Sequence, residues 1–192
     1  MKKKVLKKII LICLVLISIF WAYTIFNLSA ENTQLKQDYK ALDKRLENVE
    51  AEWDSVHVLT TKITELAPPK VDRLSKKKLG FYIHYFGKKY QESEIIKDIM
   101  ISLPYIESTY YKYAVGLAGE LGYYQIHPIH NLDMTRVFDE DYQVENAYKI
   151  LMRNVERHGE LEHAVNGYNG WPSTKNPYYG KVVIQLAKLK NI

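Results

Sequence analysis

The first third of the chain carries two hydrophobic patterns, one after the other. Residues 9–26 form a nearly continuous apolar run, interrupted only by Ser18, Tyr23 and Thr24. As a helix this run would be about 27 Å long, close to the roughly 30 Å of a bilayer's hydrocarbon layer. The pattern therefore predicts a transmembrane anchor over residues 9–27.

The charged residues before the apolar run orient it. Residues 1–8 contain five lysines and no acid, and positively charged flanks remain in the cytoplasm. We therefore expect a cytoplasmic tail over residues 1–8, a single-pass anchor in the cytoplasmic membrane, and export of the rest to the periplasmic or cell-wall side. The alternative is a cleaved signal peptide, but its apolar core is usually shorter, and Leu28-Ser29-Ala30 matches a cleavage site only in part.

A second pattern begins at Leu35, where apolar residues recur in alternating steps of four and three. One heptad position holds Leu35, Leu42, Val49, Val56 and Ile63, and the other holds Tyr39, Leu46, Trp53 and Thr60. This spacing is typical of a coiled-coil seam and predicts a helical stalk over residues 31–67 that self-associates. The alternative is an amphipathic helix folded onto its own domain. Pro68 and Pro69 end the helix and put a domain boundary near residue 70.

Residues 71–192 show helical rather than strand periodicity. Apolar residues recur every three or four positions, for example over residues 144–155. Ser93 is placed to begin one helix and Gly159 to end another. Glycines gather in residues 116–122 and 167–180. The pattern predicts a mainly α-helical domain whose helices are joined by functional loops.

The formal charge of +5 comes entirely from the first 30 residues, and residues 31–192 carry as many basic as acidic groups. That balance excludes a nucleic-acid-binding domain, which needs clustered positive charge. Cys13 is the only cysteine, so the rest of the chain holds no disulfide, cysteine nucleophile or cysteine metal ligand. His127 and His130 have no obvious third ligand beside them. We expect neither a metal ion nor a cofactor.

One carboxyl group stands out among the acids of residues 71–192. Glu107 follows an apolar helical stripe and is flanked by Tyr105, Ile106 and Tyr110. Apolar surroundings solvate a carboxylate poorly and raise its pKa, which suits a general acid near neutral pH. The alternative is an ordinary surface glutamate at the end of a helix.

Three blocks of sequence favour the first interpretation. They are Glu107-Ser108, then Gly119-Glu120-Leu121-Gly122-Tyr123-Tyr124-Gln125-Ile126-His127-Pro128, then Ala164-Val165-Asn166-Gly167-Tyr168-Asn169-Gly170. In this order they resemble the family 1 lytic transglycosylases, which read E-S-x-F-x-P-x-A-x-S, G-A-x-G-L-M-Q-I-M-P and A-A-Y-N-A-G. The preceding Leu103-Pro104-Tyr105-Ile106 is most similar to the membrane-bound D-type members. The resemblance covers roughly residues 80–185.

The resemblance implies a lysozyme-like, goose-type helical fold that acts on peptidoglycan glycan strands. The reaction would cleave the β-1,4 bond between N-acetylmuramic acid and N-acetylglucosamine and leave a 1,6-anhydro end. Glu107 aligns with the family's single catalytic glutamate, acting first as acid and then as base. Because the family uses the substrate's acetamido group, no second carboxylate is required.

The resemblance also implies substrate-binding roles for Ser108, Tyr124, Gln125, Tyr168 and Asn169. The alternatives are a backbone cap for Ser108, a loop-stabilising amide for Gln125 and a packed tyrosine for Tyr168. Tyr123 and Tyr124 replace Leu-Met in the family pattern, and an aromatic wall there would stack on a sugar face.

Departures from the family pattern leave other activities open. Glu120 replaces a small alanine of the family pattern and adds a charge to the loop that would line the substrate cleft. Glu120 and Glu162 are the reserve acids if Glu107 is structural. Two further interpretations remain, a hydrolytic muramidase on the same fold and a non-catalytic glycan-binding scaffold in a membrane-spanning secretion or phage apparatus.

Overall fold

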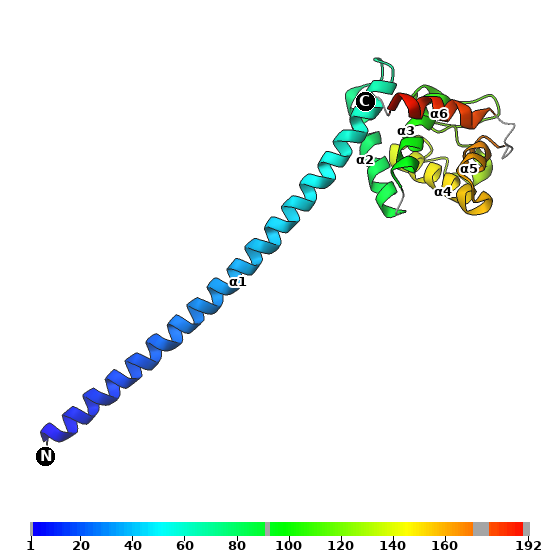
Figure 1. Cartoon of the computed structure of the whole chain (residues 1–192). Coiled ribbons are helices and arrows are strands. Elements are labelled where there is room, and N and C mark those ends of the chain that lie inside the picture. The colour runs from blue at the N-terminus through cyan, green and yellow to red at the C-terminus, as the bar shows by residue number, and fades with distance from the viewer. Residues whose placement is uncertain (1, 91–92, 171–176, 190–192) are drawn as a thin grey trace. The chain divides into compact units, whose positions relative to one another are not determined.

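The computed structural model describes the backbone of residues 2–90, 93–170 and 177–189, with side chains from residue 16 onward. The elements are α1 (Lys2–Leu66), α2 (Arg73–Lys89), α3 (Glu94–Ser108), η1 (Pro128–His130), α4 (Glu140–His158), α5 (Leu161–Tyr168) and α6 (Tyr178–Leu189) (Figure 1). The predicted mainly α-helical class is confirmed. The chain divides into two compact units, residues 1–52 and 53–192.

The predicted membrane anchor is corrected by the structure. Within the described residues, no helix contains an apolar stretch long enough to cross a bilayer. The side chains of residues 1–15, which include the tail and the start of the predicted anchor, lie outside the described set. The finding contradicts the single-pass anchor over residues 9–27 and the localisation derived from it.

The predicted helix over residues 31–67 is confirmed, because α1 continues without a break to Leu66, directly before Ala67 and the two prolines. The two halves of its apolar seam differ in solvent exposure. Leu35, Leu42 and Val49 are each more than half exposed. Val56 and Ile63, later on the same seam, are 8% and 0% exposed, and Ile63 belongs to the core of residues 53–192.

The end of α1 therefore belongs to the second compact unit, which begins at Trp53 and not near residue 70. Leu59 and Ile63 pack into that unit's core, and Gly80 of α2 allows α1 a close approach. A Cβ atom at Gly80 would lie 2.6 Å from Thr60 Oγ1. For this segment the structure supports the alternative of a helix packed on its own domain.

Self-association through the exposed seam of residues 35–49 stays a prediction. We expect Leu42→Glu to convert the full chain to a monomer in sedimentation equilibrium, because each buried leucine contributes about 1.5–3 kcal/mol. Lys44→Glu, on the outer face, is the matched control. A wild-type chain that sediments as a monomer would contradict the prediction.

The core of residues 53–192 is built around α3 and α4. Ile99, Met100, Ile101 and Leu103 of α3 are fully buried, as is Leu151 of α4. α4 packs against α2 and α5, and α3 packs against α6. Burial of these apolar side chains is the main favourable contribution to folding.

Local signals set several helix ends. Asp72 caps α2 by accepting a hydrogen bond from the Ser75 N–H at 2.9 Å. Ser93 precedes the first residue of α3, although its side chain makes no capping hydrogen bond, and Gly159, with φ +71°, follows the last residue of α4. The predicted start of α3 after Ser93 and the predicted end of α4 at Gly159 are confirmed, whereas the side-chain cap by Ser93 is not. Glycine is favoured at the end of α4 because a positive φ strains other residues.

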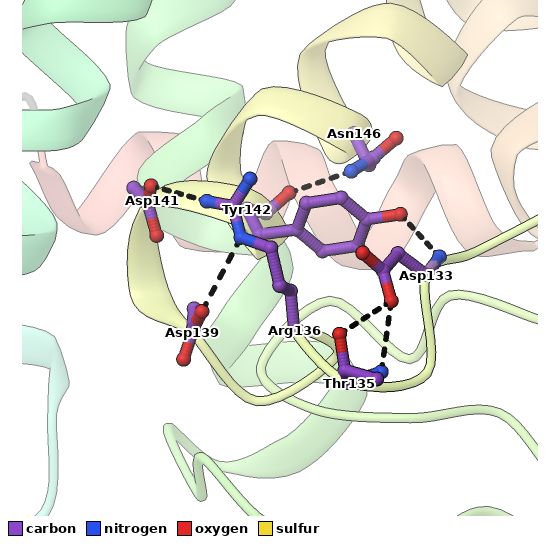
Figure 2. Close-up of polar contacts among 7 residues, drawn as sticks. All are labelled: Asp133, Thr135, Arg136, Asp139, Asp141, Tyr142 and Asn146. Carbon is purple, nitrogen blue, oxygen red and sulfur yellow. Dashed lines mark hydrogen bonds and ion pairs between the residues drawn. The ribbon is translucent and has the colours of Figure 1, made fainter.

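A polar cluster fastens the loop after η1 to the start of α4 (Figure 2). The Arg136 guanidinium donates to Asp141 Oδ2 at 2.7 Å and lies 5.1 Å from the centre of the Tyr142 ring. The Tyr142 hydroxyl accepts the Asp133 N–H at 2.6 Å, and Asp133 in turn accepts the Thr135 N–H and hydroxyl. The cluster holds in place the segment that follows His127 and His130.

Candidate active site

Glu107 lies in the last turn of α3, where the backbone reverses direction. Thr109 and Tyr110 have φ values of +53° and +59°, in the left-handed region. The Tyr110 N–H donates to Pro104 O at 2.9 Å, and its buried hydroxyl donates to Ile101 O at 2.6 Å. These two hydrogen bonds hold Tyr110 against α3. The Glu107 side chain lies at the end of the helix and faces the loops.

Glu107 lines a cavity of about 720 Å³ together with Gln125, Tyr168 and Asn169. Each of the three sequence blocks contributes to this wall, although they lie up to about sixty residues apart in the chain. The volume falls in the range of small-molecule and substrate pockets. A second cavity, of about 800 Å³, lies between the end of α1 and α2, and none of the predicted site residues lines it.

The loop between α3 and η1, called the cleft loop below, is held by several hydrogen bonds, which position Gln125. Leu121 and Ile126 exchange backbone hydrogen bonds of 3.1 and 3.0 Å, and this pairing closes the turn. Gln125 takes φ +45°, and its side-chain Nε2 donates to Gly122 O at 2.9 Å. At Gly122, with φ +78°, an added Cβ would lie 2.3 Å from Gln143 Oε1. The same Gln143 oxygen accepts the Tyr123 N–H at 2.6 Å and so ties the loop to α4.

Tyr178, at the start of α6, is a site residue that the sequence analysis missed. Its hydroxyl donates a hydrogen bond to Glu107 Oε1, and the residue is 4% exposed. The chain has 16 tyrosines, so residue type alone did not single it out. Only the packing of α6 against α3 brings these two side chains together.

Burial raises the pKa of the Glu107 carboxyl above its ordinary value, and the Glu120 carboxylate adds to this rise. The hydrogen bond from Tyr178 and the positive charge of Lys181 oppose it. Because desolvation is the largest cause, Glu107 retains its proton to a higher pH than an exposed glutamate. A group of this kind suits general acid catalysis.

Tyr168 and Asn169 lie at the end of α5, on the cavity wall. The Tyr168 hydroxyl donates to Tyr124 O at 3.0 Å. Burial raises the pKa of Tyr168 well above its usual value, and the charge of Glu107 adds to the effect. Asn169 is exposed at the C-cap of α5. The Tyr168 hydroxyl is thus hydrogen-bonded to a backbone carbonyl, while the Tyr168 side chain still borders the cavity.

Two of the predicted substrate-binding residues are corrected. Tyr124 is fully buried, and its hydroxyl donates to Met100 O at 3.0 Å, so it is a core residue and not a platform for a sugar ring. Ser108 is absent from the cavity lining; its hydroxyl donates to Tyr123 O at 2.9 Å and to Pro104 O at 3.1 Å. Ser108 therefore braces the backbone beside Glu107, as its structural alternative proposed.

The reserve acids separate in the structure. Glu120 lines the cavity, and its Oε2 accepts the Ala118 N–H at 3.1 Å. The side chain lies close to Gly116, where an added Cβ would be 2.2 Å from Glu120 Oε2. Glu162, at the start of α5, is not part of the lining. Of these two reserve acids, Glu120 is therefore the one that lines the site.

Among the described residues, no group of three or more His, Cys, Asp or Glu side chains is placed to hold a metal ion. No family model, curated protein or solved structure matches the chain. Of the residues in the three sequence blocks, Glu107, Gln125, Tyr168 and Asn169 share one cavity.

Proposed function

We propose that the chain is a peptidoglycan lytic transglycosylase with Glu107 as its general acid and base. The observation that carries the proposal is a half-buried carboxyl group of raised pKa in a cavity that it shares with Gln125, Tyr168 and Asn169. For residues 71–192 we infer the goose-type, lysozyme-like fold that the sequence blocks imply, with the acid at the end of a buried central helix.

The reaction needs one proton donor that later accepts a proton. Protonated Glu107 gives its proton to the glycosidic oxygen as the bond from that oxygen to C1 of the muramoyl residue breaks. The carboxylate then takes the proton of the 6-hydroxyl as that oxygen bonds to C1, which closes the 1,6-anhydro ring and restores the acid. No water enters the product. Tyr178 donates its hydrogen bond to Glu107 and holds the carboxyl in place through both steps.

One observation favours a hydrolytic muramidase as the second candidate. Glu120 lines the same cavity as Glu107 and raises its pKa, and most glycosidases that use water have two carboxyl groups. In that reaction Glu120 would take the proton of the attacking water, and the product would carry a reducing end.

Product analysis distinguishes the two reactions. Purified sacculi are digested with the full chain, and the released muropeptides are analysed by mass spectrometry. A transglycosylase gives ends lighter by one water than hydrolysed ends, and Glu120→Gln still gives them. Reducing ends that disappear in Glu120→Gln would establish the muramidase instead. Release of no muropeptides by the wild-type chain would refute both enzymes.

A further inference from the structure

The α4–α5 end of the cavity is lined by nitrogen donors. Asn154, Arg157 and His158 of α4 all border the cavity, as do His127 and His130 from the η1 segment. Positions 154, 157 and 158 are three and four residues apart, so they share one face of α4. The acids in the cavity lining are Glu107 and Glu120, which come from α3 and from the cleft loop.

Asn154 is the unusual member of this group. The residue is 8% exposed, and its side-chain Nδ2 has no hydrogen-bond partner within the described parts of the chain. A buried donor without a partner costs about 1–3 kcal/mol. A donor of this kind does not stabilise the fold. It fits a position where a ligand supplies the missing hydrogen-bond acceptor.

Gly167 of α5 borders both the cavity and this buried donor. A Cβ atom at Gly167 would lie 3.4 Å from Asn154 Nδ2 and 3.5 Å from His158 Nε2. A larger side chain at this position would therefore contact both nitrogen atoms. Because Gly167 also lines the cavity, the space that its missing side chain leaves is continuous with the space in front of Glu107.

A group that suits these donors is an acceptor with negative charge. The Asn154 amide supplies N–H donors, Arg157 supplies a permanent positive charge, and His158 supplies a ring nitrogen. Carboxylates are the planar anions that guanidinium groups bind with paired hydrogen bonds. In peptidoglycan the sugars carry neutral hydroxyl and acetamido groups, whereas the peptide stem on the lactyl group carries carboxylates.

We propose that Asn154, Arg157 and His158 form a subsite for a carboxylate of the peptide stem. The proposal rests on the proposed function, since it takes the glycan strand to lie along Glu107. It makes the chain selective for strands whose stem carboxylates are free over strands whose stem carboxylates have been converted to amides.

The test compares kcat/KM on strands with free stem carboxylates and on the same strands after these carboxylates have been converted to amides. We expect the wild-type chain to prefer the strands with free carboxylates by about 10-fold or more, the worth of a hydrogen bond to a charged group. Arg157→Gln and Asn154→Leu should each bring this ratio close to one. Arg153→Gln makes the same change one turn earlier on α4, at an exposed position outside the cavity lining, and should keep the wild-type ratio. A wild-type ratio of one, or equal losses on both substrates in the two subsite variants, would overturn the subsite.

A binding measurement separates failure of the subsite from failure of the enzyme. Calorimetry with Glu107→Gln, which leaves the subsite intact, compares a disaccharide carrying its stem peptide with the same molecule after its stem carboxylates have been converted to amides. Tighter binding of the first, lost when Arg157→Gln is added, supports the subsite even if no cleavage is found. Equal binding of the two ligands would refute the subsite while leaving cleavage by Glu107 untouched.

Discussion

Glu107→Gln is expected to lower the cleavage rate of sacculi by about 100-fold to 10,000-fold, the usual contribution of a general acid. The glutamine has the same shape and can still accept the Tyr178 hydrogen bond, but it has no proton to give to the glycosidic oxygen. Release of soluble muropeptides measures the loss. Glu162→Gln makes the same change outside the cavity lining and serves as the control. Equal cleavage by wild type and Glu107→Gln would remove Glu107 from the reaction.

The same variant, although less active, is expected to be more stable than the wild type at neutral pH. Burial raises the folded-state pKa of Glu107 above about 4.5, so the folded state binds this proton more tightly than the unfolded state does. The stability that this proton contributes is complete below the unfolded pKa and is lost as pH rises through the folded pKa. Glutamine does not titrate. We therefore expect Glu107→Gln to melt at a higher temperature than the wild type at neutral pH, with the difference shrinking towards pH 4.

Tyr178→Phe is expected to slow cleavage by about 10-fold or more, since hydrogen bonds to charged groups contribute about 1.5–3 kcal/mol. Tyr178 touches the acid, so we expect the loss mainly in kcat. Its hydrogen bond lowers the pKa of Glu107, and removing it raises that pKa further. The high-pH limb of the kcat/KM profile, where the acid loses its proton, should therefore move to higher pH.

Tyr179→Phe is the matched control for this prediction. Tyr179 is the next residue of α6, and its backbone N–H donates to Asn166 Oδ1 at 2.8 Å. The control should keep the wild-type pH profile. If the two phenylalanine variants share one profile, Tyr178 has no direct role at Glu107 and only packs α6 against α3.

The pinned cleft loop shows how local sequence and tertiary contacts combine at the site. The spacing of Gly122 and Gln125 is visible in the sequence, and both residues take positive φ. The reason for glycine at position 122 is Gln143, which lies in α4 and fills the space of a side chain. Sequence alone indicates that a turn is present, but the partner that demands the glycine is known only from the packing.

The sequence by itself determined the helical class, the end of α1 before Pro68, the start of α3 after Ser93 and the end of α4 at Gly159. These features depend on residues that are neighbours along the chain, where periodicity, proline and glycine act directly. The choice of Glu107 as the candidate acid came instead from the resemblance of three separated sequence blocks. The tertiary structure decided what covers each apolar face, which periodicity cannot report. It placed Ile63 and Tyr124 in the core, brought Tyr178 to Glu107, and put Asn154 on the cavity wall, with its Nδ2 unpaired among the described residues.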